Sequence, residues 1–245
     1  MQGRSIRYFM EADTHTLKKK AQFAGILYLI WVITGIYGAM YVPSHTIVPG
    51  DAFATANKIH VNEFLFRTGI ANDFLGLLVG IILILTLYQL LKPVNESQAK
   101  LMVALLIVTF PVGFIMDAFN IASLKILEGS VLKTFETGQR QDIAMLLFKI
   151  NDNATITLEM FWGLWLLPFG WLVYNSTFIP RVLGVFLILN GVAYIIHCLS
   201  HILLPNYQVF IFRLSVPFWI LGEISIMLWL LIWGVKTKRS TNDFN

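Results

Sequence analysis

The chain has 245 residues, of which 57% are hydrophobic and only 13% are charged, and its net charge is +4. A soluble domain carries roughly 25% charged residues, so this composition excludes an ordinary water-soluble domain and predicts a surface that faces lipid. The single cysteine, Cys198, excludes an internal disulfide.

The excess positive charge gathers in the two terminal regions, at Lys18–Lys20 and at residues 236–239. Basic clusters beside membrane spans set topology and attract anionic lipid. We therefore expect the lipid bilayer as the partner of these clusters, and no nucleic acid.

Six stretches are apolar over the roughly 20 residues that an α-helix needs to cross a bilayer. In chain order they are residues 21–42, 66–91, 101–124, 154–174, 181–204 and 214–235. Pro43, Pro93 and Pro205 follow the first, second and fifth stretches, where proline ends a helix. Pro111 and Pro168 lie inside the third and fourth and predict kinks.

The fold class that follows is all-α: a polytopic membrane protein built as a bundle of six transmembrane helices. More than half of the 18 lysines and arginines lie on the cytoplasmic side if the N-terminus is inside, as the positive-inside rule requires. We therefore expect cytoplasmic tails at residues 1–20 and 237–245, and a membrane domain over residues 21–236.

The long outer loop, residues 125–153, has apolar residues at helical spacing at Ile143, Leu146, Leu147 and Ile150. This pattern predicts a short amphipathic helix. Such a helix either lies on the outer membrane surface or packs on the mouth of the bundle.

Ionisable side chains inside the spans each cost about 3 kcal/mol on insertion scales, so they normally face the bundle interior. The candidates are Asp73, Asp117, Glu159, His197, His201 and Glu223. With a rise of about 1.5 Å per residue, all of them fall in the outer half of the bundle if the N-terminus is inside. We predict one polar layer that opens outward, extended by Asn72, Asn120 and Asn190.

The helix faces agree with this layer. On the fifth span the polar residues form a single stripe: Asn190, Tyr194, His197 and His201. On the second span Asp73 shares a face with Gly76 and Gly80, and this glycine spacing lets helices approach closely. Trp162 and Trp219 lie near the layer and could line a cavity.

His197 and His201 are four residues apart, a spacing that suits one metal ion, and two carboxylates could complete a zinc site. A metal-bound water could then attack an ester or an amide, which makes a metal-dependent intramembrane hydrolase the alternative function. The pattern lacks the glutamate of the H-E-x-x-H motif. The other reading is that each histidine hydrogen-bonds a carboxylate or a carbonyl, and we expect no cofactor.

The leading hypothesis is a non-enzymatic membrane protein that binds or moves a small molecule, an ion or a lipid through an outward-facing polar cavity. Its predicted ligand-binding residues are Arg67, Asp73, Asp117, Asn120, Glu159, His197, Arg213 and Glu223. Arg67 and Arg213 would be countercharges at the mouth. A third hypothesis is a structural protein without a ligand, in which the polar layer only sets helix register. The sequence does not indicate the oligomeric state.

An ordered series of segments resembles one family. They are IVPGDAFATANKI, LFRTGIANDFL, LYQLLKPVN, GLWLLPFGWLVYNSTFIPRVLGVFLILNGVAYII, LLPNY and GEISIMLWLLIWGVK. This series, from about Lys20 to Lys236, resembles the DUF4386 family of bacterial multi-pass membrane proteins.

The polar positions that match the family's motifs are Pro49, Gly50, Asp51, Arg67, Asp73, Lys92, Pro93, Pro205, Asn206, Tyr207, Gly222 and Glu223. The resemblance implies a bacterial cytoplasmic membrane and offers no catalytic residues. It also implies that an acidic residue often stands at the place of His197, so that the histidine pair is particular to this chain.

Overall fold

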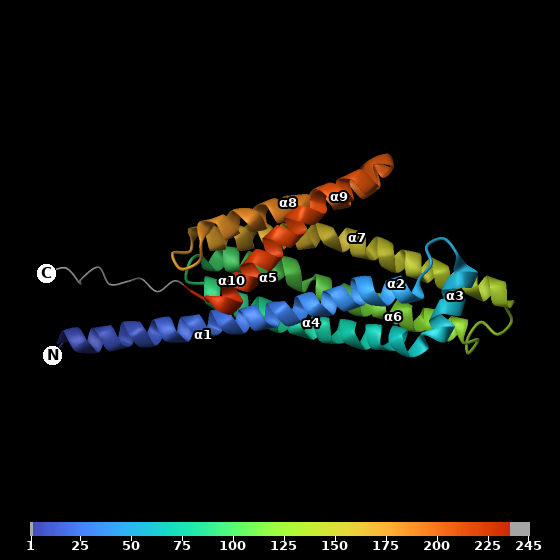
Figure 1. Cartoon of the computed structure of the whole chain (residues 1–245), viewed down its shortest axis with the longest axis horizontal. Helices are drawn as coiled ribbons and strands as arrows, with labels where there is room; N and C mark the ends of the chain where they lie inside the picture. Colours follow the sequence, from blue (N-terminus) through green and yellow to red (C-terminus); the bar gives the residue numbers. More distant parts are fainter. Residues whose placement is uncertain (1, 236–245) are drawn as a thin grey trace. The chain divides into compact units, whose positions relative to one another are not determined.

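The computed structural model describes residues 2–235, with side chains from residue 15 onward, and every element in this part of the chain is helical (Figure 1). The α-helices are α1 (Gln2–Ile36), α2 (Val42–Thr46), α3 (Ala52–Val61), α4 (Glu63–Leu91), α5 (Glu96–Ile107), α6 (Thr109–Leu127), α7 (Thr137–Asn175), α8 (Arg181–Leu203), α9 (Gln208–Trp219) and α10 (Ser225–Ile232). Two π-helical segments, η1 (Tyr37–Tyr41) and η3 (Ile220–Ile224), and one 3₁₀ turn, η2 (Pro205–Tyr207), join some of them.

Six helical stretches of the described chain are long and apolar enough to cross a membrane. They are His15–Thr46, Glu63–Leu91, Glu96–Leu127, Thr137–Asn175, Arg181–Leu203 and Pro205–Ile232. The predicted fold, an all-α protein with six spans, is thus confirmed. The predicted tail 237–245 lies outside the described residues.

Proline shapes these spans in different ways. The third span divides at Val108 into α5 and α6, and Pro111 then lies near the start of α6, where a missing N–H is tolerated best. Pro168, in contrast, lies inside α7, which continues through it. Pro217 lies inside α9, and the π-helical segment η3 begins three residues later.

The predicted short amphipathic helix is the first part of α7 and is continuous with the fourth span. Ala144 and Phe148 are buried in a core cluster, and Ile143 and Leu147 pack against that cluster. Ile143 and Leu147 of the predicted apolar set therefore pack on the core of the second unit, whereas Leu146 and Ile150 are exposed.

The chain divides into two compact units. The first contains the described residues of Met1–Leu29, Ile82–Leu106 and Glu159–Asn245, and the second contains Ile30–Ile81 and Ile107–Leu158.

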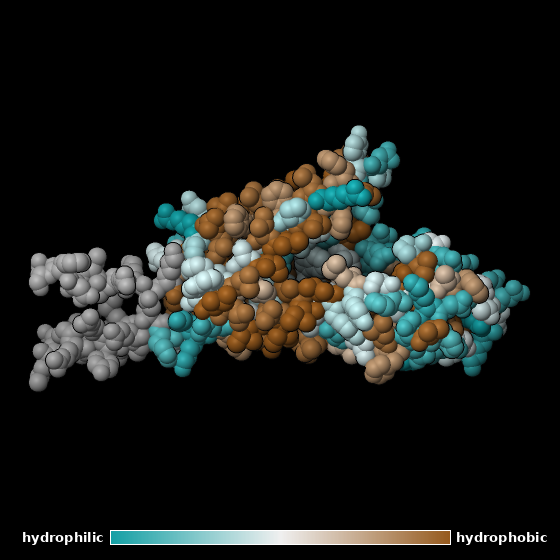
Figure 2. Space-filling model, in the orientation of Figure 1, coloured by the Kyte–Doolittle hydropathy of each residue, from teal (hydrophilic) through white to brown (hydrophobic). Residues whose placement is uncertain are grey.

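Glycines allow close contact between α7 and α8 in the first unit. A Cβ atom added at Gly163 would lie 2.5 Å from the carbonyl oxygen of Gly191, and one at Gly184 would lie 2.6 Å from that of Gly170. The backbones of α7 and α8 thus touch at two levels, which only glycine permits. Figure 2 shows hydrophobic side chains gathered over α8, α9 and α10 of this unit, as expected for a surface that meets lipid.

The second unit has its core where α3 and the ends of α4, α6 and α7 meet. The buried members are Val42, Ile59, Phe66, Ile70, Leu124, Ile126, Ala144 and Phe148. The side chain of Asp51 caps α3 by accepting a hydrogen bond from the backbone N–H of Ala54 at 2.8 Å. Figure 2 shows hydrophilic side chains around α3, the end of this unit that meets water.

Candidate functional site

The polar residues of the spans form two groups, one inside each unit. The first unit holds Tyr28, Glu159, Asn190, Tyr194, His197 and Glu223. The second unit holds Asn72, Asp73, Asp117, Asn120 and Asn151. The single layer of the sequence analysis, shared by all the spans, stays a prediction.

Glu223 is the centre of the first group and belongs to the π-helical segment η3. Its carboxylate accepts hydrogen bonds from Tyr194 Oη at 3.2 Å, Asn190 Nδ2 at 3.4 Å and Tyr28 Oη at 3.4 Å. N–H···O and O–H···O bonds are strongest near 2.7–3.0 Å, so these three contacts are long. The carboxylate is surrounded by neutral donors and held loosely by each.

Asn190 can approach Glu223 because the residue before Glu223 is a glycine, Gly222. A Cβ atom at Gly222 would lie 2.5 Å from the Cβ atom of Asn190, so a larger residue would push α8 away from η3. Asn190 is fully buried, and its Oδ1 has no hydrogen-bond partner within the described chain. A buried amide oxygen without a hydrogen-bond donor destabilises the folded state. A proton donor or a cation bound at this place would therefore be stabilised by the free oxygen.

Aromatic rings pack around the same carboxylate. Trp219 lies one helical turn before Glu223, and its ring stacks on Tyr194 with centroids 4.8 Å apart. Trp162 meets the other side of Tyr194 edge-on at 6.2 Å. Trp219 Nε1 is buried and has no acceptor among the residues that the structure describes. Trp162 and Trp219 thus lie near the polar residues, and each ring packs on Tyr194.

Glu159 and His197 form a buried pair between α7 and α8. Glu159 Oε2 and His197 Nδ1 are 2.5 Å apart, and each residue is 7% exposed. Trp219 covers the imidazole edge-on at 5.3 Å between ring centroids. The histidine therefore takes a carboxylate as its partner, which is one of the two readings given to it by the sequence.

In the second unit, Asp73 lies on α4 opposite small residues of α1 and η1. Asn72 Nδ2 donates to the carbonyl oxygen of Thr34 at 2.9 Å and reaches Asp73 Oδ1 at 3.4 Å. Gly38 leaves the space that the Asp73 carboxylate fills, since a Cβ atom there would collide with Oδ1. Gly76, one turn further on α4, faces Thr34 in the same way.

Asp117 is buried on α6, in the same unit as Asp73. Asn120 Nδ2 contacts Asp117 Oδ1 at 3.4 Å, and Asn151 Nδ2 donates to Asn120 Oδ1 at 2.8 Å. Asn151 of α7 thereby connects the fourth span to the acidic pair of the second unit.

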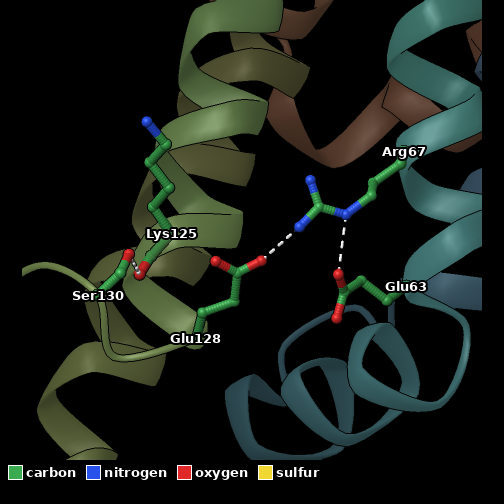
Figure 3. A network of polar contacts seen from close by, with 5 residues as sticks. All are labelled: Glu63, Arg67, Lys125, Glu128 and Ser130. Carbon is green, nitrogen blue, oxygen red and sulfur yellow. Dashed lines mark hydrogen bonds and ion pairs between the residues drawn. The ribbon is translucent and has the colours of Figure 1, made fainter.

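The predicted countercharges, Arg67 and Arg213, are both exposed. Arg67 is exposed and pairs with Glu63 at 2.8 Å and with Glu128 at 2.6 Å, as Figure 3 shows. It therefore neutralises carboxylates at the helix ends and not Asp73. Arg213 is exposed on α9, and no ion pair joins it to a carboxylate in the described part of the chain.

The predicted metal ligands, His197 and His201, gain no cluster of further ligands. Among residues 15–235, no three His, Cys, Asp or Glu side chains come together in a way that could hold a metal ion. His201 is half-buried, and its backbone carbonyl accepts a hydrogen bond from Gln208 Nε2 at 3.0 Å.

Sequence reasoning missed Tyr28 and Asn151. Tyr28 is fully buried and stands in an apolar run where only its hydroxyl group marks it. Asn151 lies in a segment that the sequence analysis treated as a loop, so its alignment with Asn120 became visible only with the continuous helix α7. Asn151 lies four residues before Thr155, which is at the start of the predicted span. Extending the helical pattern one turn beyond that start would therefore have found Asn151.

Six apolar helices with buried carboxylates, amides and one imidazole between them define a polytopic α-helical membrane protein. The family model described as "Domain of unknown function (DUF4386)" matches residues 23–234, and the chain therefore belongs to this family. Neither the curated proteins nor the solved structures contain a significant match to the chain.

Proposed function

We propose that this protein moves a solute across the membrane and that a proton or a small cation bound at Glu223 drives or accompanies the movement. One observation carries the proposal: the carboxylate of Glu223 lies inside a span and contacts only neutral donors. Ionisable residues in membranes normally pair with opposite charges and mark ion or proton pathways. No lysine, arginine or histidine of the described chain forms an ion pair with Glu223, so a proton or a cation from outside the protein must balance its charge.

A path for that proton runs along one face of α8. Asn190 and Tyr194 contact Glu223, and His197 contacts Glu159. From Asn190 to His197 the helix rises by about 10 Å. Carboxylates and histidines are the usual components of proton relays in membrane proteins, and here they meet one face of α8 in two separate hydrogen-bonded groups.

The helix that carries Glu223 is irregular at this residue. Pro217 and the π-helical segment η3 interrupt the last span between α9 and α10. Prolines and π-bulges are the places where helices bend, and π-bulges are frequent at functional sites. An irregular backbone beside a loosely held carboxylate supports a role in a conformational cycle.

We also propose a bacterial cytoplasmic membrane as the location, with both termini inside. The positive-inside distribution of lysine and arginine and the resemblance of the sequence to bacterial relatives support this assignment. The acidic pair of the second unit, Asp73 and Asp117, is the second candidate for binding a cation along the transport route.

The test uses purified full-length protein reconstituted into liposomes that contain a pH-sensitive dye. A potassium gradient with valinomycin imposes a membrane potential that is negative inside, and the dye reports proton entry. We expect proton entry in wild type, a fall to the rate of empty liposomes in Glu223→Gln, and no change in Glu136→Gln, an exposed control.

Sodium uptake measured with the radioactive ion tests the cation form of the proposal with the same variants. The proposal is overturned if the wild type conducts neither ion, or if Glu223→Gln conducts like the wild type. Asp73→Asn and Asp117→Asn tell whether the second acidic pair belongs to the route, because unchanged flux would remove that pair from it.

A further inference from the structure

We propose that the groove between α4 and α6 in the second unit binds one phospholipid, with its phosphate at Lys125 and an acyl chain along the apolar wall. The groove has a volume of about 280 Å³. Its lining residues are Arg67, Ile70, Ala71, Phe74, Ile121, Leu124, Lys125 and Glu128. This site lies entirely within one unit and is independent of Glu223.

The lining residues form two matching stripes. On α4 they are residues 67, 70, 71 and 74, and on α6 and its C-cap they are residues 121, 124, 125 and 128. Spacings of three and four residues place each set on one helix face. Because the charged residues stand at one end of both stripes, the groove is polar at that end and apolar over the remaining length. This arrangement matches an amphiphile, which has a polar headgroup at one end and an apolar chain over the rest of its length.

The polar end of the groove coincides with the ends of the spans. Arg67 lies in the second turn of α4, which begins at Glu63, and Lys125 lies in the last turn of α6, which ends at Leu127. Helix ends are where headgroups and water meet a membrane protein. The apolar residues, in contrast, lie deeper along both helices, where acyl chains are.

A helix cap holds this end of the groove in shape. Ser130 N–H donates to the carbonyl oxygen of Lys125 at 3.2 Å, and Gly129 N–H donates to that of Ile126 at 3.1 Å. With Gly129 at a φ of +71°, this is a Schellman motif. The motif fixes Glu128, the last residue before the turn, beside Arg67.

The charges at this end leave one cation without a partner. Arg67 lies between two carboxylates, those of Glu63 and Glu128, so its guanidinium group is already fully engaged. Figure 3 shows the Lys125 side chain extending away from the Glu128 carboxylate, and no carboxylate within the described residues pairs with its ammonium group. A phosphate beside Lys125 would pair with this ammonium group.

The floor of the groove suits an acyl chain. Ile70 and Leu124 are buried at its base, and Phe74 and Ile121 are more exposed along its length. Lipid tails and such side chains are equally apolar, so the gain comes from packing in a shaped groove. The combination of a phosphate site and an apolar channel identifies a phospholipid and not a free fatty chain.

The test titrates delipidated, detergent-purified full-length protein with phosphatidylglycerol and counts bound lipids by native mass spectrometry. We expect one lipid per chain to bind more tightly than the rest. Since one lysine near a membrane surface contributes enough to change lipid affinity about fivefold, Lys125→Gln should weaken that lipid by this factor. Lys133→Gln, an exposed lysine of the same unit outside the groove, is the control.

A second variant tests the apolar wall. Ala71→Trp places a large side chain in the groove and should abolish the tight site, whereas Leu75→Trp, at an exposed position outside the lining, should not. Circular dichroism and gel filtration check the fold of each variant. Lys125→Gln, a change at an exposed position, keeps the test decisive if Ala71→Trp does not fold.

Three outcomes would overturn the proposal. The first is that diacylglycerol, which lacks the phosphate, binds as tightly as phosphatidylglycerol. The second is that inorganic phosphate alone binds at the same concentration and displaces the lipid, because the ligand would then be a free anion. The third is that Lys125→Gln and Lys133→Gln bind the lipid with the same affinity.

Discussion

Glu159 and His197 face each other across the α7–α8 contact with Oε2 and Nδ1 2.5 Å apart, beside the place where the two helices are closest. Gly163 stands one turn along α7 from Glu159, and a Cβ atom there would lie 2.5 Å from the carbonyl oxygen of Gly191. Close backbone contact thus brings an acid and an imidazole within hydrogen-bonding distance in a buried environment.

This pair should couple α7 to α8 energetically. Polar contacts between membrane helices contribute about 1–2 kcal/mol in model peptides. We therefore expect a coupling of that size in a double-mutant cycle of Glu159→Gln and His197→Gln, measured as the free energy of unfolding in mixed detergent micelles. The control cycle uses Glu96 and Lys100, an exposed pair 2.9 Å apart whose coupling should be too small to resolve. Additive effects at Glu159 and His197 would show that the pair does not hold the helices together.

Gly184 should be the least tolerant small residue of the α7–α8 contact. An added Cβ atom would lie 2.6 Å from both Gly170 O and Tyr174 N, which are backbone atoms that cannot turn aside. We expect Gly184→Ala to lower the free energy of unfolding by about 1–3 kcal/mol. Gly35→Ala is the matched control, because Gly35 is also helical and has no atom within 4 Å of the added Cβ. Equal stability of the two variants would contradict this packing.

Zinc should not bind stoichiometrically to the histidine pair. A zinc site needs three or four protein ligands, and the described residues place no third ligand of the His, Cys, Asp or Glu type with His197 and His201. We expect purified protein, after incubation with zinc and dialysis, to contain well below one equivalent by elemental analysis. One equivalent in wild type that disappears in His201→Ala would instead support the hydrolase hypothesis.

Chemical labelling tests the prediction that both termini lie on the cytoplasmic side. In a chain with Cys198→Ala, we expect Lys58→Cys on α3 to react with a membrane-impermeant maleimide in intact bacterial cells. Ser97→Cys, at the start of α5, should react only after the cells are permeabilised, because the positive-inside rule places it in the cytoplasm. Both positions are exposed. Labelling of Ser97→Cys alone in intact cells would reverse the orientation.

Hydropathy was sufficient for the fold class because the bilayer itself sets the requirement. A span must be about 20 residues long and apolar, and its backbone must satisfy its own hydrogen bonds as a helix. Each of the six spans meets these conditions through its own residues. The same rule identified Asp117, Glu159, His197 and Glu223, since a charge in an apolar run is visible without knowing its neighbours.

The tertiary structure decided which of these groups meet. Glu159 pairs with His197, Asn151 reaches Asn120, and Arg67 turns to Glu128. These partners come from different helices, and their contact depends on helix rotation and on glycine-mediated approach, neither of which a hydropathy pattern contains. Local composition in this protein therefore determines which segments enter the bilayer, whereas side-chain packing determines which of their polar groups come into contact.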